Sequence, residues 1–171
     1  MTDDKKLSTQ ELKDQILQIL NRQGRIALGQ LADLLGAEED VVQTLIRELE
    51  EERVILGYGA IIDWTKVNQD EVTGLIEVRV TPQRGRGFDR IASRIYNFPE
   101  VSSCYLMSGD YDLLVTVEGR NLREVAEFVS EKISVIEDVL STRTHFILKQ
   151  YKLNGHMLIA SPDDEREVLV L

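Results

Sequence analysis

VSSCYLMSGDYDLLVTVEG, residues 101–119, decides the fold of the second half of this chain. The stretch predicts two strands of alternating side chains joined by a tight turn, for which Gly109 can supply a positive φ. Asp110 and Asp112 flank Tyr111 at the tip of this hairpin, where core packing requires no carboxylate. Polar groups held at the end of rigid strands commonly build binding sites, so the tip is a candidate site.

The segments around this hairpin complete a recognisable order of elements. Residues 72–80 alternate as a strand, 88–95 carry a helical apolar stripe, 122–133 form a second such stripe, and 140–151 predict a last strand. This βαββαβ order is ferredoxin-like: an antiparallel sheet with both helices on one side. The open face of such a sheet must be covered, and a second copy of the chain is the simplest cover. We therefore expect a dimer.

The first sixty residues have a helical period. Ser8 and Glu11 have the spacing of a capping box at the start of a first helix that ends near Gly24. A second helix fits 28–35, a third fits 38–52, and 54–62 predicts a hairpin with glycines at its bend. Three helices followed by a short hairpin form a winged helix-turn-helix.

The fold class expected is therefore α+β, with two domains. Residues 1–62 form the winged helix-turn-helix domain, 63–71 lose periodicity and act as a linker, and 72–171 form the ferredoxin-like domain. In the tail, 157–160 fits a short strand added to a neighbouring sheet.

Composition excludes several classes of protein. No run of eighteen apolar residues is present, so we expect no membrane span, and the polar start does not fit a secretory signal. The single cysteine, Cys104, fits a reducing cytoplasm. Two histidines and one cysteine without clustered spacing indicate no metal site, and no motif indicates a cofactor.

The net charge of −10 argues against long-range attraction to nucleic acid. Residues 1–64 carry seven Lys/Arg against thirteen Asp/Glu, a net of −6, and 65–171 carry thirteen against seventeen, a net of −4. DNA binding would have to rely on local contacts and would depend strongly on salt.

Motifs at matching spacing extend over about residues 9–152. In the first part they are Gly24-Arg25-Ile26, Leu31-Ala32, Gly36, Val42, Ile46, Leu49-Glu50, Ile55 and Gly57-Tyr58; in the second, Ser108-Gly109-Asp110-Tyr111-Asp112 and Thr142-Arg143-Thr144. With these motifs the chain resembles the leucine-responsive/asparagine-responsive (Lrp/AsnC) family of transcription regulators. The resemblance implies a DNA-binding domain, an effector domain for an amino acid or related metabolite, and dimers that assemble into tetramers or octamers.

The third helix carries the candidate DNA contacts. Asp40, Gln43, Thr44 and Arg47 lie at i, i+3, i+4 and i+7 and share one face, and Arg53 follows the helix. Gln43 could read adenine and Arg47 guanine or phosphate. The same pattern also fits a solvated helix face. The helix departs from the family pattern because it is acidic, and because Arg53 stands where a glycine commonly ends it.

The candidate effector residues are those of the hairpin tip and of the last strand: Ser108, Gly109, Asp110, Tyr111, Asp112, Thr142 and Thr144. The aspartates could hold an ammonium group beside Tyr111. Alternatively they only accept hydrogen bonds from turn amides. The two threonines share a strand face and could supply hydroxyls, or reflect β-propensity alone.

The main hypothesis is a sequence-specific transcription regulator whose DNA affinity or assembly changes with an amino-acid effector. Its partners would be DNA, the effector and other copies of itself. A second hypothesis is a small-molecule-binding oligomer without DNA recognition, which would explain the acidic third helix. A third is an enzyme like certain haem-pathway decarboxylases, against which the histidines form no evident pair with an acid or base.

Overall fold

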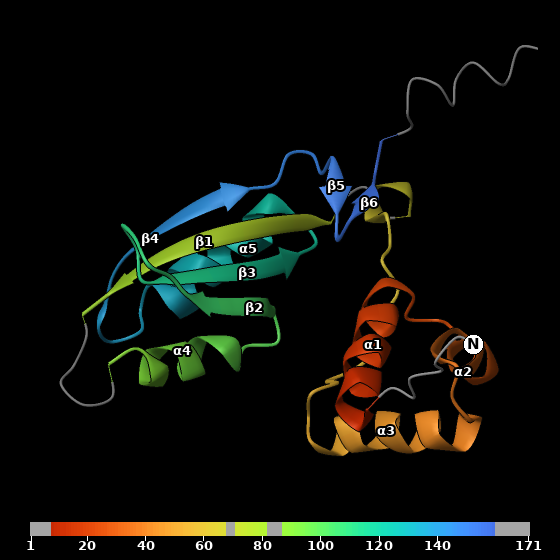
Figure 1. The fold of residues 1–171 in the computed structure, drawn as a ribbon. Coiled ribbons are helices and arrows are strands. Elements are labelled where there is room, and N and C mark those ends of the chain that lie inside the picture. Colours follow the sequence, from red (N-terminus) through yellow and green to blue (C-terminus); the bar gives the residue numbers. More distant parts are fainter. Residues whose placement is uncertain (1–7, 68–70, 82–86, 160–171) are drawn as a thin grey trace, which may run out of the picture. The chain divides into compact units, whose positions relative to one another are not determined.

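A computed structural model describes residues 8–67, 71–81 and 87–159 of the chain. The chain divides into two compact units, the first ending at Ile61 and the second beginning at Ile62. Figure 1 shows the elements of each unit. In the described ranges no helix is long and apolar enough to cross a membrane.

The first unit contains three helices: α1 (Thr9–Arg22), α2 (Leu28–Leu35) and α3 (Glu39–Glu51). The predicted capping box is confirmed, since the Ser8 hydroxyl accepts from the Glu11 amide and the Glu11 carboxylate accepts from the Ser8 amide. Gly36 ends α2 in the left-handed conformation, with φ +61°. A small core joins the three helices; its buried members are Ile16, Leu31, Ala32, Leu35, Val42, Leu45 and Leu49.

The hairpin predicted over residues 54–62 is not formed: these residues contain no strand. An isolated two-stranded hairpin is marginally stable, and Gly57 and Gly59 weaken it further. Leu56, 80% exposed, has no core to pack against. The segment is instead tied to α3 through Tyr58, whose hydroxyl donates to Glu50 at 2.8 Å.

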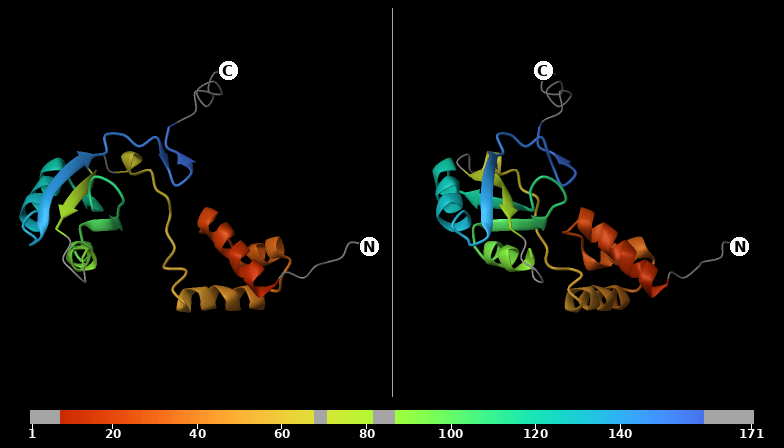
Figure 2. Two further views of the ribbon diagram at one scale, coloured as in Figure 1. Left: turned by 60° about the vertical axis from the view of Figure 1, so that its left-hand side comes forward. Right: turned by 90° about the vertical axis from the view of Figure 1, so that its left-hand side faces the viewer.

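The second unit has the predicted βαββαβ order. The unit begins with a short 3₁₀ helix, η1 (Trp64–Lys66). It is followed by β1 (Val72–Val80), α4 (Asp89–Tyr96), β2 (Val101–Leu106), β3 (Leu113–Gly119), α5 (Leu122–Phe128) with its π-helical continuation η2 (Val129–Ile133), and β4 (Val139–Phe146). The strands pair antiparallel in the order β2-β3-β1-β4. Both helices cover the same face of this sheet, as Figures 1 and 2 show, which confirms the ferredoxin-like prediction.

The core of the second unit lies between the sheet and these helices. Alternate residues of β1, among them Ile76 and Val78, are fully buried against Ile91 and Ile95 of α4 and Ile133 of η2. The opposite face of the sheet has no helix of the described residues against it. Period-two alternation therefore places one apolar face inward and leaves the other open.

The last strand is shorter than predicted, ending at Phe146 rather than near Tyr151. Its partner β1 begins at Val72, and Gly74 already pairs with Phe146, so the ladder runs out of partner residues. Beyond it, β5 (Lys152–Leu153) pairs with β6 (His156–Met157) through a two-residue turn with positive φ at both positions. The strand predicted at 157–160 is thus replaced by this small hairpin, and residues 160–171 lie outside the described ranges.

Candidate functional site

The predicted DNA face of α3 is exposed as a unit. Asp40, Gln43, Thr44 and Arg47 all lie on the solvent side of the helix, opposite the buried Val42, Leu45 and Leu49. The Thr44 hydroxyl donates to the backbone carbonyl of Asp40 at 2.8 Å, so its proton is already used within the helix. Gln43 and Arg47 therefore offer the donors of this face, and their contact with DNA stays a prediction.

Arg53 occupies the position after α3 where glycine is favoured, with φ +58°. The Val54 amide donates to the Leu49 carbonyl and the Arg53 amide to the Glu50 carbonyl, the two bonds of a Schellman motif. A non-glycine residue in this left-handed region costs roughly 1 kcal/mol. The Arg53 side chain is exposed, and a glycine at this position would remove that cost.

The carboxylates in the second half of α3 all have partners within the unit. Lys13 of α1 reaches Glu48 at 3.0 Å and Glu52 at 3.3 Å, and its pKa is raised chiefly by the hydrogen bond to Glu48. Glu51 lies 3.9 Å from Arg47. Sequence reasoning missed Lys13, because only the packing of α1 against α3 brings it to these carboxylates.

Glu50 is held by Tyr58. Partial burial and the bond to this carboxylate raise the pKa of Tyr58 to about 12. At the other end of the helix, Glu39 and Asp40 stand in the first turn, where the helix dipole favours negative charge. Most carboxylates of α3 therefore either contact a partner side chain or lie in the first turn, where the helix dipole favours them.

The hairpin tip has the predicted geometry. Gly109 takes φ +148°, and Ser108, Gly109 and Asp110 are exposed. Within the described part of the chain, the side chains of Asp110 and Tyr111 make no hydrogen bond or ion pair. Asp110 is thus available to a ligand that carries a positive charge.

Asp112 has a different role. Its carboxylate accepts from the Val80 amide at 2.8 Å, while its own amide donates to the Val78 carbonyl and its carbonyl accepts from Met107. The side chain continues the ladder between β1 and β3 after the backbone pairing has ended. Asp112 therefore accepts a hydrogen bond from a backbone amide, which was the alternative to a role in ligand binding.

Thr142 and Thr144 share one face of β4, as predicted, but it is the face toward the helices. The Thr142 hydroxyl lies 3.2 Å from that of Ser134, and the Thr144 methyl lies close to Gly74. β1 stands between β4 and the β3 end of the hairpin, so two strand spacings, roughly 10 Å, separate the threonine pair from Asp112. A single chain does not bring the two halves of the predicted effector site together.

The open face carries a charged cluster that sequence reasoning missed. Glu77 of β1 lies 3.0 Å from His145 and 3.4 Å from Arg143, both on β4. The strand register places Arg143 opposite Glu77 and His145 opposite Leu75. Only the register, which the sequence does not reveal, juxtaposes these residues.

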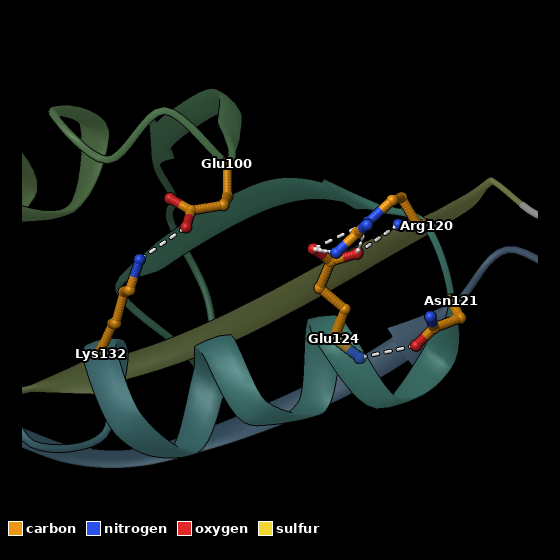
Figure 3. A network of polar contacts seen from close by, with 5 residues as sticks. All are labelled: Glu100, Arg120, Asn121, Glu124 and Lys132. Carbon is orange, nitrogen blue, oxygen red and sulfur yellow. Dashed lines mark hydrogen bonds and ion pairs between the residues drawn. The ribbon is translucent and has the colours of Figure 1, made fainter.

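A hollow of about 170 Å³ lies where β3 meets α5, and Figure 3 shows its polar contacts. Lys132 binds Glu100 at 2.6 Å and lowers the pKa of that carboxyl. Arg120 pairs with Glu124, and Asn121 caps α5 by accepting from the Glu124 amide. Glu100 thus joins η2 to the residue before β2, and Glu124 joins the first turn of α5 to the loop that follows β3.

Comparison with known proteins finds similar proteins over nearly the whole chain. The family described as the Lrp/AsnC ligand binding domain matches residues 73–157. The "uncharacterized HTH-type transcriptional regulator YugG" of Bacillus subtilis is 49% identical over 93% of this chain and 96% of its own length. The "proline dehydrogenase transcriptional activator" of Rhizobium radiobacter is 29% identical, over 82% of this chain and 89% of its own.

A solved structure gives the same result. The AsnC family transcriptional regulator from Agrobacterium tumefaciens superposes with a TM-score of 0.66 at 28% identity, covering 89% of this chain and 96% of that one. Both units thus have counterparts in one and the same regulator.

Proposed function

The chain belongs to the Lrp/AsnC family of transcription regulators, and from this premise we propose that α3 binds specific DNA sites and that an amino acid or related metabolite bound by the second unit alters that binding. The exposed face of α3, on which Gln43 and Arg47 offer donor groups to solvent, is the observation that carries the DNA half. Amide and guanidinium groups at this spacing match base edges and phosphates in a major groove. We propose no catalytic activity.

The effector half rests on Asp110. Its exposed carboxylate stands beside Tyr111 within the residues matched by the ligand-binding family, which favours a ligand with an ammonium group. The relative named as an activator of proline dehydrogenase supports an effector connected with amino-acid metabolism. Asp112 would position the tip through Val80 rather than bind the ligand directly.

The open face of the sheet supports self-association. Leu75, Leu114 and Tyr105 lie on it among the charged residues of β1 and β4, and a second copy would remove this apolar surface from water. We propose a homodimer through this face, with tetramers or octamers as further assemblies. Neighbouring copies would then complete an effector site that one chain leaves open on the side of Asp110.

A mobility-shift assay tests the proposal directly. The full chain is titrated onto duplex DNA from the region upstream of its own coding sequence, at low and at physiological salt. A shift at low salt that an amino acid strengthens or weakens is the expected result. Intact, folded protein that shifts no DNA even at low salt would favour the alternative of a small-molecule-binding oligomer without DNA recognition.

A further inference from the structure

Lys13 of α1 lies largely covered between two carboxylates at the C-terminal end of α3. The Lys13 side chain is only 14% exposed, although lysine is normally a surface residue. Its ammonium group lies between two carboxylates, 3.0 Å from Glu48 and 3.3 Å from Glu52. Pairing with carboxylates stabilises the charge of a partly buried lysine, and here one cation faces two anions.

The two carboxylates stand beside the proposed DNA face. Thr44, Glu48 and Glu52 follow one another at i, i+4 and i+8, so they form a row along the flank of that face. Both glutamate side chains remain about half exposed, 44% and 57%. Without a partner they would be free to extend toward phosphates that approach Arg47.

We propose that Lys13 is a positioning residue for DNA binding, which neutralises Glu48 and Glu52 and holds them toward α1 so that α3 can approach the phosphate backbone. The inference rests on the proposed function, since it assigns a role within the same DNA face. It explains how the acidic N-terminal part of the chain, with a net charge of −6 over residues 1–64, can use an acidic helix for recognition. Lys13 does not itself touch DNA in this arrangement.

Charge arithmetic separates this role from simple helix packing. Lys13→Met keeps the buried stem and takes the charge of residues 1–64 from −6 to −7. The triple variant Lys13→Met/Glu48→Gln/Glu52→Gln removes the lysine and both carboxylates, giving −5. If Lys13 acts by neutralising the glutamates, the triple variant binds DNA at least as well as the wild type. If Lys13 only stabilises the packing of α1 against α3, the triple variant binds DNA as poorly as Lys13→Met.

The experiment measures affinity for mixed-sequence duplex DNA by fluorescence anisotropy at about 50 mM and about 200 mM salt, the range over which phosphate contacts are strongly screened. Lys13→Met is expected to weaken binding by on the order of tenfold at the lower salt, for a dimer that places two copies on DNA, and by much less at the higher salt. The triple variant is expected to restore binding.

Lys66→Met is the matched control, because Lys66 pairs with Asp63 at 3.5 Å outside the three-helix unit. It removes one positive charge from the chain and should leave DNA affinity within about twofold of wild type. Circular dichroism establishes that every variant keeps its helices. Unchanged binding by Lys13→Met, or a triple variant that stays weak, overturns the inference alone; a wild-type chain that binds no DNA at low salt overturns the proposed function and the inference together.

Discussion

Helix α3 and the β2–β3 hairpin tip both carry several carboxylates, but the partners of these carboxylates differ. On α3, Glu48, Glu50 and Glu51 each meet a partner side chain in the same unit. At the tip, Asp112 is tied to a backbone amide whereas Asp110 is left exposed. The number of carboxylates on a surface therefore does not predict its role. The partner of each carboxylate decides whether it repels DNA, stabilises the fold or is available to a ligand.

The largest expected effect tests whether the two units are separately stabilised. Ile76→Ala removes a fully buried side chain from the sheet core and should lower the free energy of unfolding of the second unit by about 3 kcal/mol. Calorimetry of the full chain should show that transition moving while the three-helix transition stays. Leu148→Ala, at a side chain 95% exposed, should move neither. A shift of both transitions by Ile76→Ala would show that the units unfold together.

The next effect separates the two aspartates of the tip. Asp112→Ala leaves the partly buried Val80 amide without its acceptor and should cost about 1–3 kcal/mol in chemical unfolding. Asp112→Asn keeps an oxygen acceptor and should recover most of that loss. Asp110→Ala should change stability by less than about 0.5 kcal/mol, because its side chain is exposed. Equal losses at both positions would contradict the division of roles.

A gain of about 1 kcal/mol is expected from Arg53→Gly, since glycine takes the left-handed conformation at the end of α3 without strain. Thermal unfolding measures the gain, and Arg53→Ala, which keeps a Cβ, should show none. DNA affinity is measured alongside. A more stable variant that binds DNA less well would place the Arg53 side chain among the DNA contacts, whereas unchanged affinity would remove it from them.

The smallest effect concerns Tyr58. Its pKa is raised to about 12, so the folded protein favours the neutral phenol over the phenolate relative to the unfolded chain. The contact with Glu50 is therefore fully present below pH about 10, the ordinary tyrosine value, and is lost as the pH rises through about 12. Spectroscopic titration should show a late phenolate step that Tyr58→Phe abolishes. An unchanged titration curve in that variant would contradict the contact.

The elements were predictable where a pattern is local. The capping box at Ser8, the helix end at Gly36 and the turn at Gly109 each depend on a few neighbouring residues, and all three are present. The hairpin at 54–62 was predicted from a change of period and from glycines at its bend, and it is absent, because two short strands without a core to cover gain too little. The end of the last strand was wrong for a related reason: it depends on where β1 begins.

The candidate sites were predictable only in part. Helical spacing placed Gln43 and Arg47 on one exposed face, as the structure has them. The partners of the carboxylates could not be predicted, because Lys13 and Glu48 are joined by helix packing, and His145 and Glu77 by strand register. Register also set Thr142 apart from the hairpin tip, with β1 between them.

The central claim is that DNA binding and effector binding reside in different units and are coupled. The most direct measurement is the DNA-binding isotherm of wild type, Arg47→Ala and Asp110→Ala, each without and with the amino acid that most raises the thermal stability of the wild type. Arg47→Ala should lose DNA binding and keep stabilisation by the amino acid. Asp110→Ala should bind DNA as wild type does without effector and fail to respond to it. An Asp110→Ala protein that still responds, or an Arg47→Ala protein that still binds DNA as tightly, would contradict the account.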